Sequence, residues 1–140
     1  MRVNLRDIAQ AAQRDPKQAL LDAVGDLADI EVFHNLVLVA TYIEPEKTAG
    51  GIILTDKTLA EGRFQGKAAL VLKRGPLAFV DDGHIKFGGV TVEPGDWVLV
   101  RPSEGLEMFK GAAGAREGAS VRLFEDSHIK GRVKDPSAIY

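Results

Sequence analysis

Residues 32–43 read VFHNLVLVATYI, and this stretch decides the fold class. Valine, isoleucine, threonine and aromatic side chains dominate it, which is typical of a β-strand. Its central LVLV lacks the apolar–polar alternation of a half-buried strand. We therefore expect a strand that is buried on both faces, one of them covered by barrel closure or by a neighbouring subunit.

Similar runs follow along the chain. They are KAALVLK (67–73), WVLV (97–100), VRLF (121–124) and HIKGRV (128–133). Turn signals such as Asp82-Gly83 and Pro94-Gly95-Asp96 separate them. Five or more short strands without helical crossovers predict a mainly β domain, built as a small antiparallel barrel or sandwich. The aromatic residues expected in its core are Phe33, Phe79, Phe87, Trp97 and Phe124.

Residues 1–31 have a different period and are predicted to form a helical N-terminal extension. One apolar stripe recurs there at helical spacing and comprises Ala19, Leu20, Ala23, Val24, Leu27 and Ala28. Asp15 fits an N-cap and Pro16 the first helical position. A shorter helix is expected from about residue 5 to residue 13. The stripe packs either on its own domain or against a partner. Residues 134–140 form a C-terminal tail.

Composition excludes several classes of function. The net charge of -2 and the pI of about 5.9 give no basic surface for nucleic acid or an anionic membrane. Cysteine is absent, which excludes disulfides and thiolate metal sites. No apolar run approaches the roughly 18 residues of a membrane span, and the N-terminus lacks the apolar core of a secretory signal. We expect a cytoplasmic protein.

The sequence shows no motif for catalysis or for a cofactor. The three histidines, His34, His84 and His128, are far apart and lack the spacing of a metal motif. Dinucleotide- and phosphate-binding signatures are missing as well. We therefore expect neither an enzyme nor a bound metal or cofactor.

Residues 44–64 are predicted to form a loop of about 21 residues between the first two strands. A loop of this length in a small domain is usually functional or disordered. Within KTAGGIILT (47–55), three large aliphatic residues follow two glycines in a polar setting. The tripeptide is either an edge strand folded back on the body or an exposed element that docks in an apolar groove. The residues alone leave both possibilities open.

The stretch FHNLVLVATYIEPEKTAGGIILT (33–55) resembles the opening of the GroES-type co-chaperonins. In that family, a first strand with a histidine before Asp or Asn leads into a loop carrying Gly-Gly and an aliphatic tripeptide. Later strands of the family resemble QGKAALVLKRG (65–75), VEPGDWVLV (92–100) and VRLFEDSHIKGRV (121–133). The resemblance implies a GroES-like small β-barrel over residues 32–133, with a roof-like hairpin at 76–90.

The resemblance also implies a function. A GroES-like subunit belongs to a homo-oligomer, a heptameric ring, and caps an ATP-dependent double-ring chaperonin to assist protein folding. The implied chaperonin-binding residues are Gly50, Gly51, Ile52, Ile53 and Leu54. In the ring, residues 32–39 of one subunit would pair with residues 129–133 of the next. The implied subunit-interface residues are Val37, Leu38, Val39, Ile129 and Val133.

The chain departs from ordinary members of the family at both ends. The extension 1–31 and the tail 134–140 have no counterpart there, so the chain is more similar to the divergent co-chaperonin-like proteins encoded by bacteriophages and prophages. Such a lid would act in the host cytoplasm. The alternative is a virion structural protein with the same fold, a capsid decoration protein whose helix and loop clamp the major capsid protein.

Overall fold

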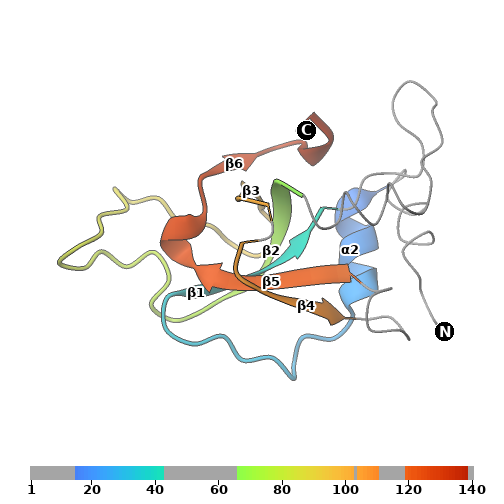
Figure 1. Cartoon of the computed structure of the whole chain (residues 1–140), viewed down its shortest axis with the longest axis horizontal. Coiled ribbons are helices and arrows are strands. Elements are labelled where there is room, and N and C mark those ends of the chain that lie inside the picture. The colour runs from blue at the N-terminus through green and yellow to red at the C-terminus, as the bar shows by residue number, and fades with distance from the viewer. Residues whose placement is uncertain (1–14, 43–65, 103, 111–118, 139–140) are drawn as a thin grey trace.

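The computed structural model of the protein describes residues 15–42, 66–102, 104–110 and 119–138. These residues form one antiparallel six-stranded sheet with a single short α-helix (Figure 1). In spatial order the strands are β4 (Leu106–Lys110), β5 (Ala119–Glu125), β1 (Leu36–Thr41), β2 (Ala68–Arg74), β3 (Trp97–Leu99) and β6 (Gly131–Val133). Two short 3-10 helices, η1 (Asp126–His128) and η2 (Pro136–Ala138), flank β6. The predicted mainly β class is confirmed.

Helix α2 (Pro16–Val24) begins where its sequence signals place it. The side chain of Asp15 accepts a hydrogen bond from Gln18 N at 3.1 Å, which satisfies one of the free N–H groups of the first turn. Pro16 occupies the first turn, where its missing N–H has no cost. The predicted N-cap and first helical residue are therefore confirmed.

The helix ends earlier than the apolar stripe suggested. Gly25 has a φ of 74°, a value that glycine adopts without steric cost, and its N–H donates to Leu21 O at 3.1 Å. Leu27 is only partly buried and Ala28 is exposed beyond this point. The predicted continuation of the helix through these two residues is wrong, because Gly25 stops the helix, but Leu27 still packs against the core cluster.

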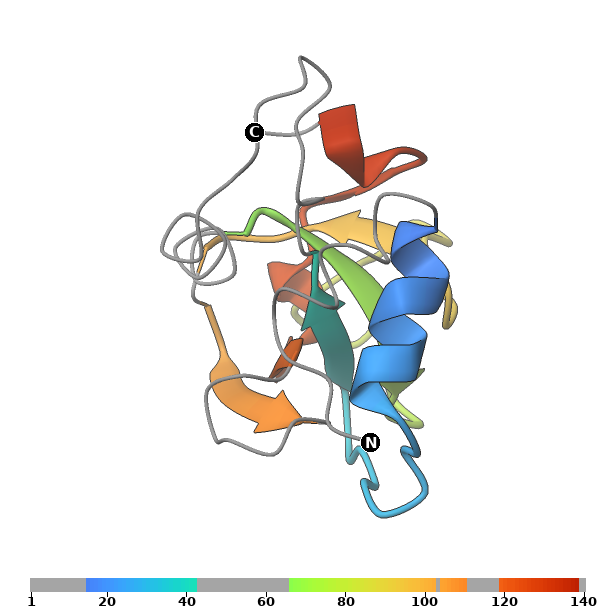
Figure 2. The same ribbon diagram turned by 90° about the vertical axis from the view of Figure 1, so that its right-hand side faces the viewer.

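The apolar stripe of α2 packs on the sheet of its own chain, beside which the helix lies in Figure 2. Leu20 and Val24 are each 1% exposed, and they share a core cluster with Leu38 of β1, Leu70 of β2 and Val121 of β5. Burying such a side chain contributes about 1.5–3 kcal/mol. Of the two interpretations of the stripe, the core helix is confirmed.

The other face of the sheet carries a second apolar cluster. It contains Val37, Val39, Ala69, Val71, Ala78, Val92, Val98, Val100 and Phe124. Strands β1 and β2 are therefore buried on both faces, as their lack of alternation predicts. Both covers come from the same chain: α2 lies on one face, and the segment after β2 contributes to the other. No neighbouring subunit is needed for this burial.

Strand β4 has no counterpart among the predicted strands. Its sequence, LEMFK, contains no β-branched residue and consists largely of good helix formers. It is a strand because it pairs with β5 over its whole length, from Leu106 opposite Leu123 to Lys110 opposite Ala119. Cross-strand pairing thus overrides the local preference.

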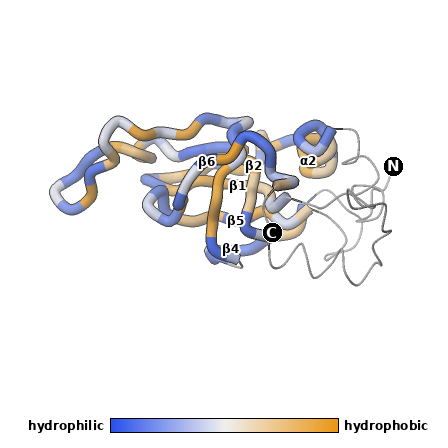
Figure 3. The backbone as a smooth tube through the Cα atoms, turned by 90° about the horizontal axis from the view of Figure 1, so that it is seen from above, coloured by the Kyte–Doolittle hydropathy of each residue, from blue (hydrophilic) through white to orange (hydrophobic). Residues whose placement is uncertain are grey.

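Residues 76–90, the expected roof-like hairpin, form an arm that extends beyond the sheet (Figures 1 and 3), while Ala78 at its base belongs to the second apolar cluster. This arm contains turns and no strand. Within the arm, Asp82 Oδ1 accepts the N–H groups of His84 at 2.6 Å and Ile85 at 2.7 Å, and these bonds lower the pKa of Asp82. Asp81 Oδ1 accepts Phe87 N at 2.8 Å. The arm is thus organised by aspartate–backbone hydrogen bonds.

Candidate functional site

The five predicted chaperonin-binding residues lie outside the described residues, within 43–65. The structure does place the two points at which this segment joins the sheet, Tyr42 after β1 and Gly66 before β2. The two strands are antiparallel neighbours, and Tyr42 N donates to Ala68 O at 2.9 Å. Residues 43–65 therefore leave and re-enter the sheet at one end of one strand pair. We call this end the loop root and define it by Thr41, Tyr42 and Gly66.

Arg122 lies at the loop root and is only 1% exposed, although its side chain is charged. It is the largest of the fully buried side chains among the described residues. It stands on β5, opposite Val39 of β1. Its guanidinium donates from Nε to Thr41 Oγ1 at 3.1 Å, from Nη1 to Arg101 O at 3.0 Å and from Nη2 to Gly66 O at 3.3 Å. One side chain thus contacts both sides of the point where residues 43–65 join the sheet.

The charge of Arg122 has polar support around it. Burial lowers the pKa of the guanidinium from its usual range, and the carboxylates of Glu107 and Glu104 act in the opposite direction. Glu107 faces Arg122 across β4 and β5 and accepts a hydrogen bond from Ser120 Oγ at 2.6 Å. Ser120 Oγ in turn lies 3.4 Å from the donating hydroxyl of Thr41. The buried cation is therefore held in a network of hydroxyl and carbonyl oxygens.

Asp126 is a second buried charge, at the opposite end of the β1–β2 pair, and is 2% exposed. Its Oδ1 accepts hydrogen bonds from Asn35 Nδ2 at 3.2 Å and from Ser127 N at 2.7 Å. Its Oδ2 accepts one from Phe79 N at 2.8 Å. Phe79 has a φ of 62°, an uncommon value for a residue with a side chain. Asp126 thus fixes the turn before β1 to the base of the arm.

Sequence reasoning identified neither Arg122 nor Asp126. The available signal was weak: Arg122 is a charged residue within the apolar strand sequence VRLF, and Asp126 lies two positions after it. A charge at such a position is equally compatible with a solvent-facing side chain. Only the packing of other segments over β5 shows that both are buried.

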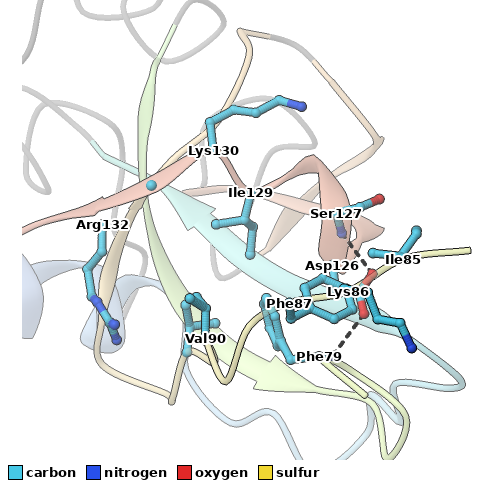
Figure 4. A pocket seen from close by; sticks show the side chains of 12 residues that line it. Phe79, Ile85, Lys86, Phe87, Val90, Asp126, Ser127, Ile129, Lys130 and Arg132 are labelled. Carbon is cyan, nitrogen blue, oxygen red and sulfur yellow. Dashed lines mark hydrogen bonds between the residues drawn. The ribbon is translucent and has the colours of Figure 1, made fainter. Parts of the chain in front are cut away.

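A pocket of about 420 Å³ lies between the arm and the segment leading into β6 (Figure 4). In Figure 4 the rings of Phe79 and Phe87 and the side chain of Val90 face Ile129. Three cationic residues, Lys86, Lys130 and Arg132, also line the pocket and are exposed. An apolar centre with a basic rim suits an apolar segment that carries acidic residues.

The predicted interface residues of β1 lie inside the chain. Val37, Leu38 and Val39 are each 0% exposed. Strand β1 is also paired on both sides, with β2 and with β5. Residues 32–39 were expected to pair with the C-terminal strand of a neighbouring subunit, and β1 has no free edge for that pairing.

The other two predicted interface residues, Ile129 and Val133, have a different position. Both are partly buried, Val133 in β6 and Ile129 just before it. Among the described residues, β6 pairs only with β3. Its outer edge therefore has no described strand next to it, and such an edge is a template for pairing with another chain. Gly131 and Arg132 of the same strand line the pocket.

Phe33 was expected in the core, and this is wrong, since its side chain is 56% exposed. The next residue, His34, has a φ of 54° in a turn closed by the hydrogen bond from Leu36 N to Phe33 O. Trp97 and Phe124 are buried as expected, at 6% and 3%. The chain just before Phe33 carries three exposed acidic side chains, Asp26, Asp29 and Glu31.

The histidines are dispersed in the structure as they are in the sequence. His34 and His84 are exposed, and His128 Nδ1 lies 3.0 Å from Glu104 Oε1. Within the described ranges, no three histidine, aspartate or glutamate side chains come together as potential metal ligands. The described part of the chain also has no helix with the length and apolar character needed to cross a membrane.

No protein-family model matches the chain, and no curated protein matches it either.

Proposed function

We propose that the protein is a co-chaperonin-like lid subunit on a GroES-like barrel, which binds a chaperonin through Ile52, Ile53 and Leu54. The observation that carries this proposal is the pattern of residues 33–55, in which a buried strand is followed by a polar segment with Gly-Gly and an aliphatic tripeptide. In support, the strands that flank the segment are adjacent, and its two ends meet at the loop root.

The tripeptide has the chemistry of a releasable anchor. Each aliphatic side chain that leaves water for an apolar groove contributes about 1.5–3 kcal/mol. Ordering the backbone opposes this by about 1–2 kcal/mol per residue, so one loop binds weakly. Several loops on one ring act together through their effective concentration, which turns weak single contacts into tight capping.

A ring is part of the proposal, and the structure favours a different contact from the pairing through β1. The pocket beside β6 joins an apolar centre to Lys86, Lys130 and Arg132. The exposed Phe33 follows an acidic stretch, residues 26–31, on the same chain. These two surfaces are complementary, and a head-to-tail contact between unlike surfaces is the kind that closes rings. Sedimentation velocity at micromolar concentration tests the ring, and a monomer would contradict it.

The capsid alternative receives less support from the described residues. In that alternative, the helix of residues 1–31 and the loop of residues 44–64 clamp the major capsid protein. The apolar stripe of α2 is instead buried in the core of its own chain, with Leu20 and Val24 each 1% exposed. Mass spectrometry of purified virions would reveal the chain if the alternative were correct.

The test is a chaperonin ATPase assay with purified chaperonin, ATP and this chain. The wild type is expected to slow ATP hydrolysis and to co-elute with the chaperonin only when nucleotide is present. Ile53→Asp places a charge in the apolar groove and removes a contact of about 1.5–3 kcal/mol, so each loop loses at least about tenfold in affinity. Because every loop of the ring carries the change, the complex should disappear.

The matched control is Thr58→Asp, which puts the same charge in the same segment outside the tripeptide. It should bind and slow the ATPase like the wild type. Equal loss in both variants would mean that added charge alone is responsible. A wild-type chain that forms no nucleotide-dependent complex with the chaperonin of its host would exclude the lid function.

A further inference from the structure

Among the described residues, the side chain of Arg122 contacts the loop root in addition to the regular backbone hydrogen bonds of the sheet. Those bonds reach Tyr42 N to Ala68 O on the β1–β2 side and Val100 N to Lys67 O on the β2–β3 side, both at 2.9 Å. Gly66, one residue further out, is linked to the sheet by Arg122 Nη2 at 3.3 Å. Arg122 therefore adds a side-chain link at Gly66, the first described residue on the β2 side of the loop root.

The shape of the guanidinium matters more here than its charge. Its three acceptors come from three segments: the end of β1, the residue two positions before β2 and the residue two positions after β3. A planar fork with rigidly spaced donors fixes three such oxygens relative to one another, which a lysine ammonium on a flexible stem does not.

Stability gives little physical reason for this arrangement. A buried ionic group is weak evidence for stability, because apolar replacements of similar volume are often neutral or stabilising. A buried arginine that contacts both ends of a long connection has a geometric effect instead: it limits the positions that those two ends can take. Limiting them before binding lowers the ordering cost that the connection pays on binding.

We propose that Arg122 is a positioning residue for residues 43–65, which holds the loop root so that the tripeptide is presented with a reduced ordering cost. The first part, the bracing of the loop root, stands on the contacts of Arg122 alone. The second part, the gain in partner affinity, rests on the proposed function. The two parts are tested by separate measurements.

Bracing is tested by amide hydrogen exchange, resolved by NMR, in the full chain carrying Arg122→Lys. Two amides at opposite ends of the β1–β2 pair provide an internal comparison: Tyr42 N, bonded to Ala68 O, and Gly75 N, bonded to Leu36 O at 2.8 Å. We expect Tyr42 to exchange at least about tenfold faster and Gly75 to stay within about twofold, because only the root end loses its fork.

The matched control is Arg74→Lys, the same change at the other end of β2. Arg74 is partly exposed and pairs with Glu93 at 3.1 Å, away from the loop root. It should leave the exchange of Tyr42 unchanged. Equal acceleration of Tyr42 and Gly75 in Arg122→Lys would show a general structural role, and unchanged exchange of Tyr42 would show no bracing. Either result overturns the proposal.

Partner affinity is measured with the chaperonin and ATP on the same samples. Arg122→Lys should weaken binding by about three- to tenfold while leaving the urea midpoint close to that of the wild type. If the amide of Tyr42 exchanges faster in Arg122→Lys but the affinity for the chaperonin does not fall, then Arg122 braces the loop root but does not position the tripeptide. If even the wild type does not bind, the proposed function fails while the exchange result still decides the bracing.

A second variant covers the case in which Arg122→Lys does not fold. Thr41→Val has nearly the same shape and removes the hydroxyl that accepts from Arg122 Nε and contacts Ser120. It leaves the bonds of Arg122 to Gly66 and Arg101 in place. We expect a smaller effect in the same direction, a roughly threefold rise in Tyr42 exchange with Gly75 unchanged. No rise at Tyr42 would contradict the bracing.

Discussion

The two ends of the β1–β2 pair are organised by opposite charges. Arg122 holds the loop root, and Asp126 holds the end at which the chain enters β1 and leaves β2. They lie four positions apart, in β5 and at the start of η1, and both are almost fully buried, at 1% and 2% exposed. A single stretch of chain thus supplies a buried cation to one end and a buried anion to the other.

The partners of the two charges differ in kind. Asp126 accepts from two backbone N–H groups and one amide side chain, in turns that are close to it. Arg122 donates to two carbonyl oxygens and a hydroxyl, next to a connection of 23 residues from 43 to 65. A buried N–H without an acceptor is rarer in proteins than a carbonyl that lacks one bond. We therefore expect Asp126 to contribute more to the free energy of unfolding, and Arg122 to contribute more to positioning the loop root.

Asp126→Ala should have the largest effect on stability. It leaves Phe79 N, Ser127 N and the Asn35 amide without their acceptor, and each unsatisfied buried donor costs about 1–3 kcal/mol. We expect a loss of about 3–5 kcal/mol in the free energy of unfolding, measured by urea denaturation. The control is Asp22→Ala on the exposed side of α2, expected within about 0.5 kcal/mol. A larger loss in Arg122→Lys than in Asp126→Ala would reverse the comparison.

Gly75→Ala tests how compact the Asp126 end is. A Cβ at Gly75 would lie 2.3 Å from His34 O and 2.7 Å from Phe33 O, backbone atoms that cannot move aside. We expect a loss of about 1–3 kcal/mol, the usual cost of overpacking, with the urea midpoint as the measure. Gly83→Ala in the arm is the control, since its Cβ would meet nothing within 4 Å. Equal stability of the two variants would contradict the close approach at Gly75.

The sequence predicts the helix and most strands of this fold better than it predicts which strands pair and which side chains are buried. The N-cap at Asp15 and five strand regions are correctly identified, because caps, β-branched runs and turn residues are local signals. Strand β4 escapes prediction since LEMFK becomes a strand only by pairing with β5. Phe33 is misplaced because the turn at His34 directs its side chain to solvent.

The candidate site shows the same division. The tripeptide Ile52–Leu54 is visible in the sequence because three aliphatic residues in a polar segment are anomalous. The loop root is not, because its contacts join Arg122 to Thr41, Gly66 and Arg101, which are 21 to 81 positions away along the chain. The central place of β1, which removes it from the predicted subunit interface, likewise depends on strand order.

Asp96 allows a comparison with Asp126 in which burial differs. Like Asp126, it accepts hydrogen bonds from a backbone N–H and from a side chain, but its own side chain is 31% exposed. Its Oδ2 accepts from Glu93 N and from Arg132 Nη1, each at 3.0 Å. The hydrogen bond from the Glu93 N–H is the main reason that the pKa of Asp96 lies below its usual 3.8; burial opposes this effect, and Arg132 adds to the lowering.

A folded-state pKa below the unfolded value means that the charge of Asp96 stabilises the fold well above pH 3.8 and that this gain is lost as the pH falls through and below 3.8. Because solvent screens the site, the gain should be less than about 1 kcal/mol at neutral pH. Asp96→Asn keeps an acceptor for Glu93 N and removes the charge. Urea midpoints of the two proteins should therefore differ at about pH 7 and converge at about pH 2. A difference between the two urea midpoints that stays constant with pH would mean that the shape of Asp96, and not its charge, stabilises the fold. Burial would then not explain the difference between Asp96 and Asp126.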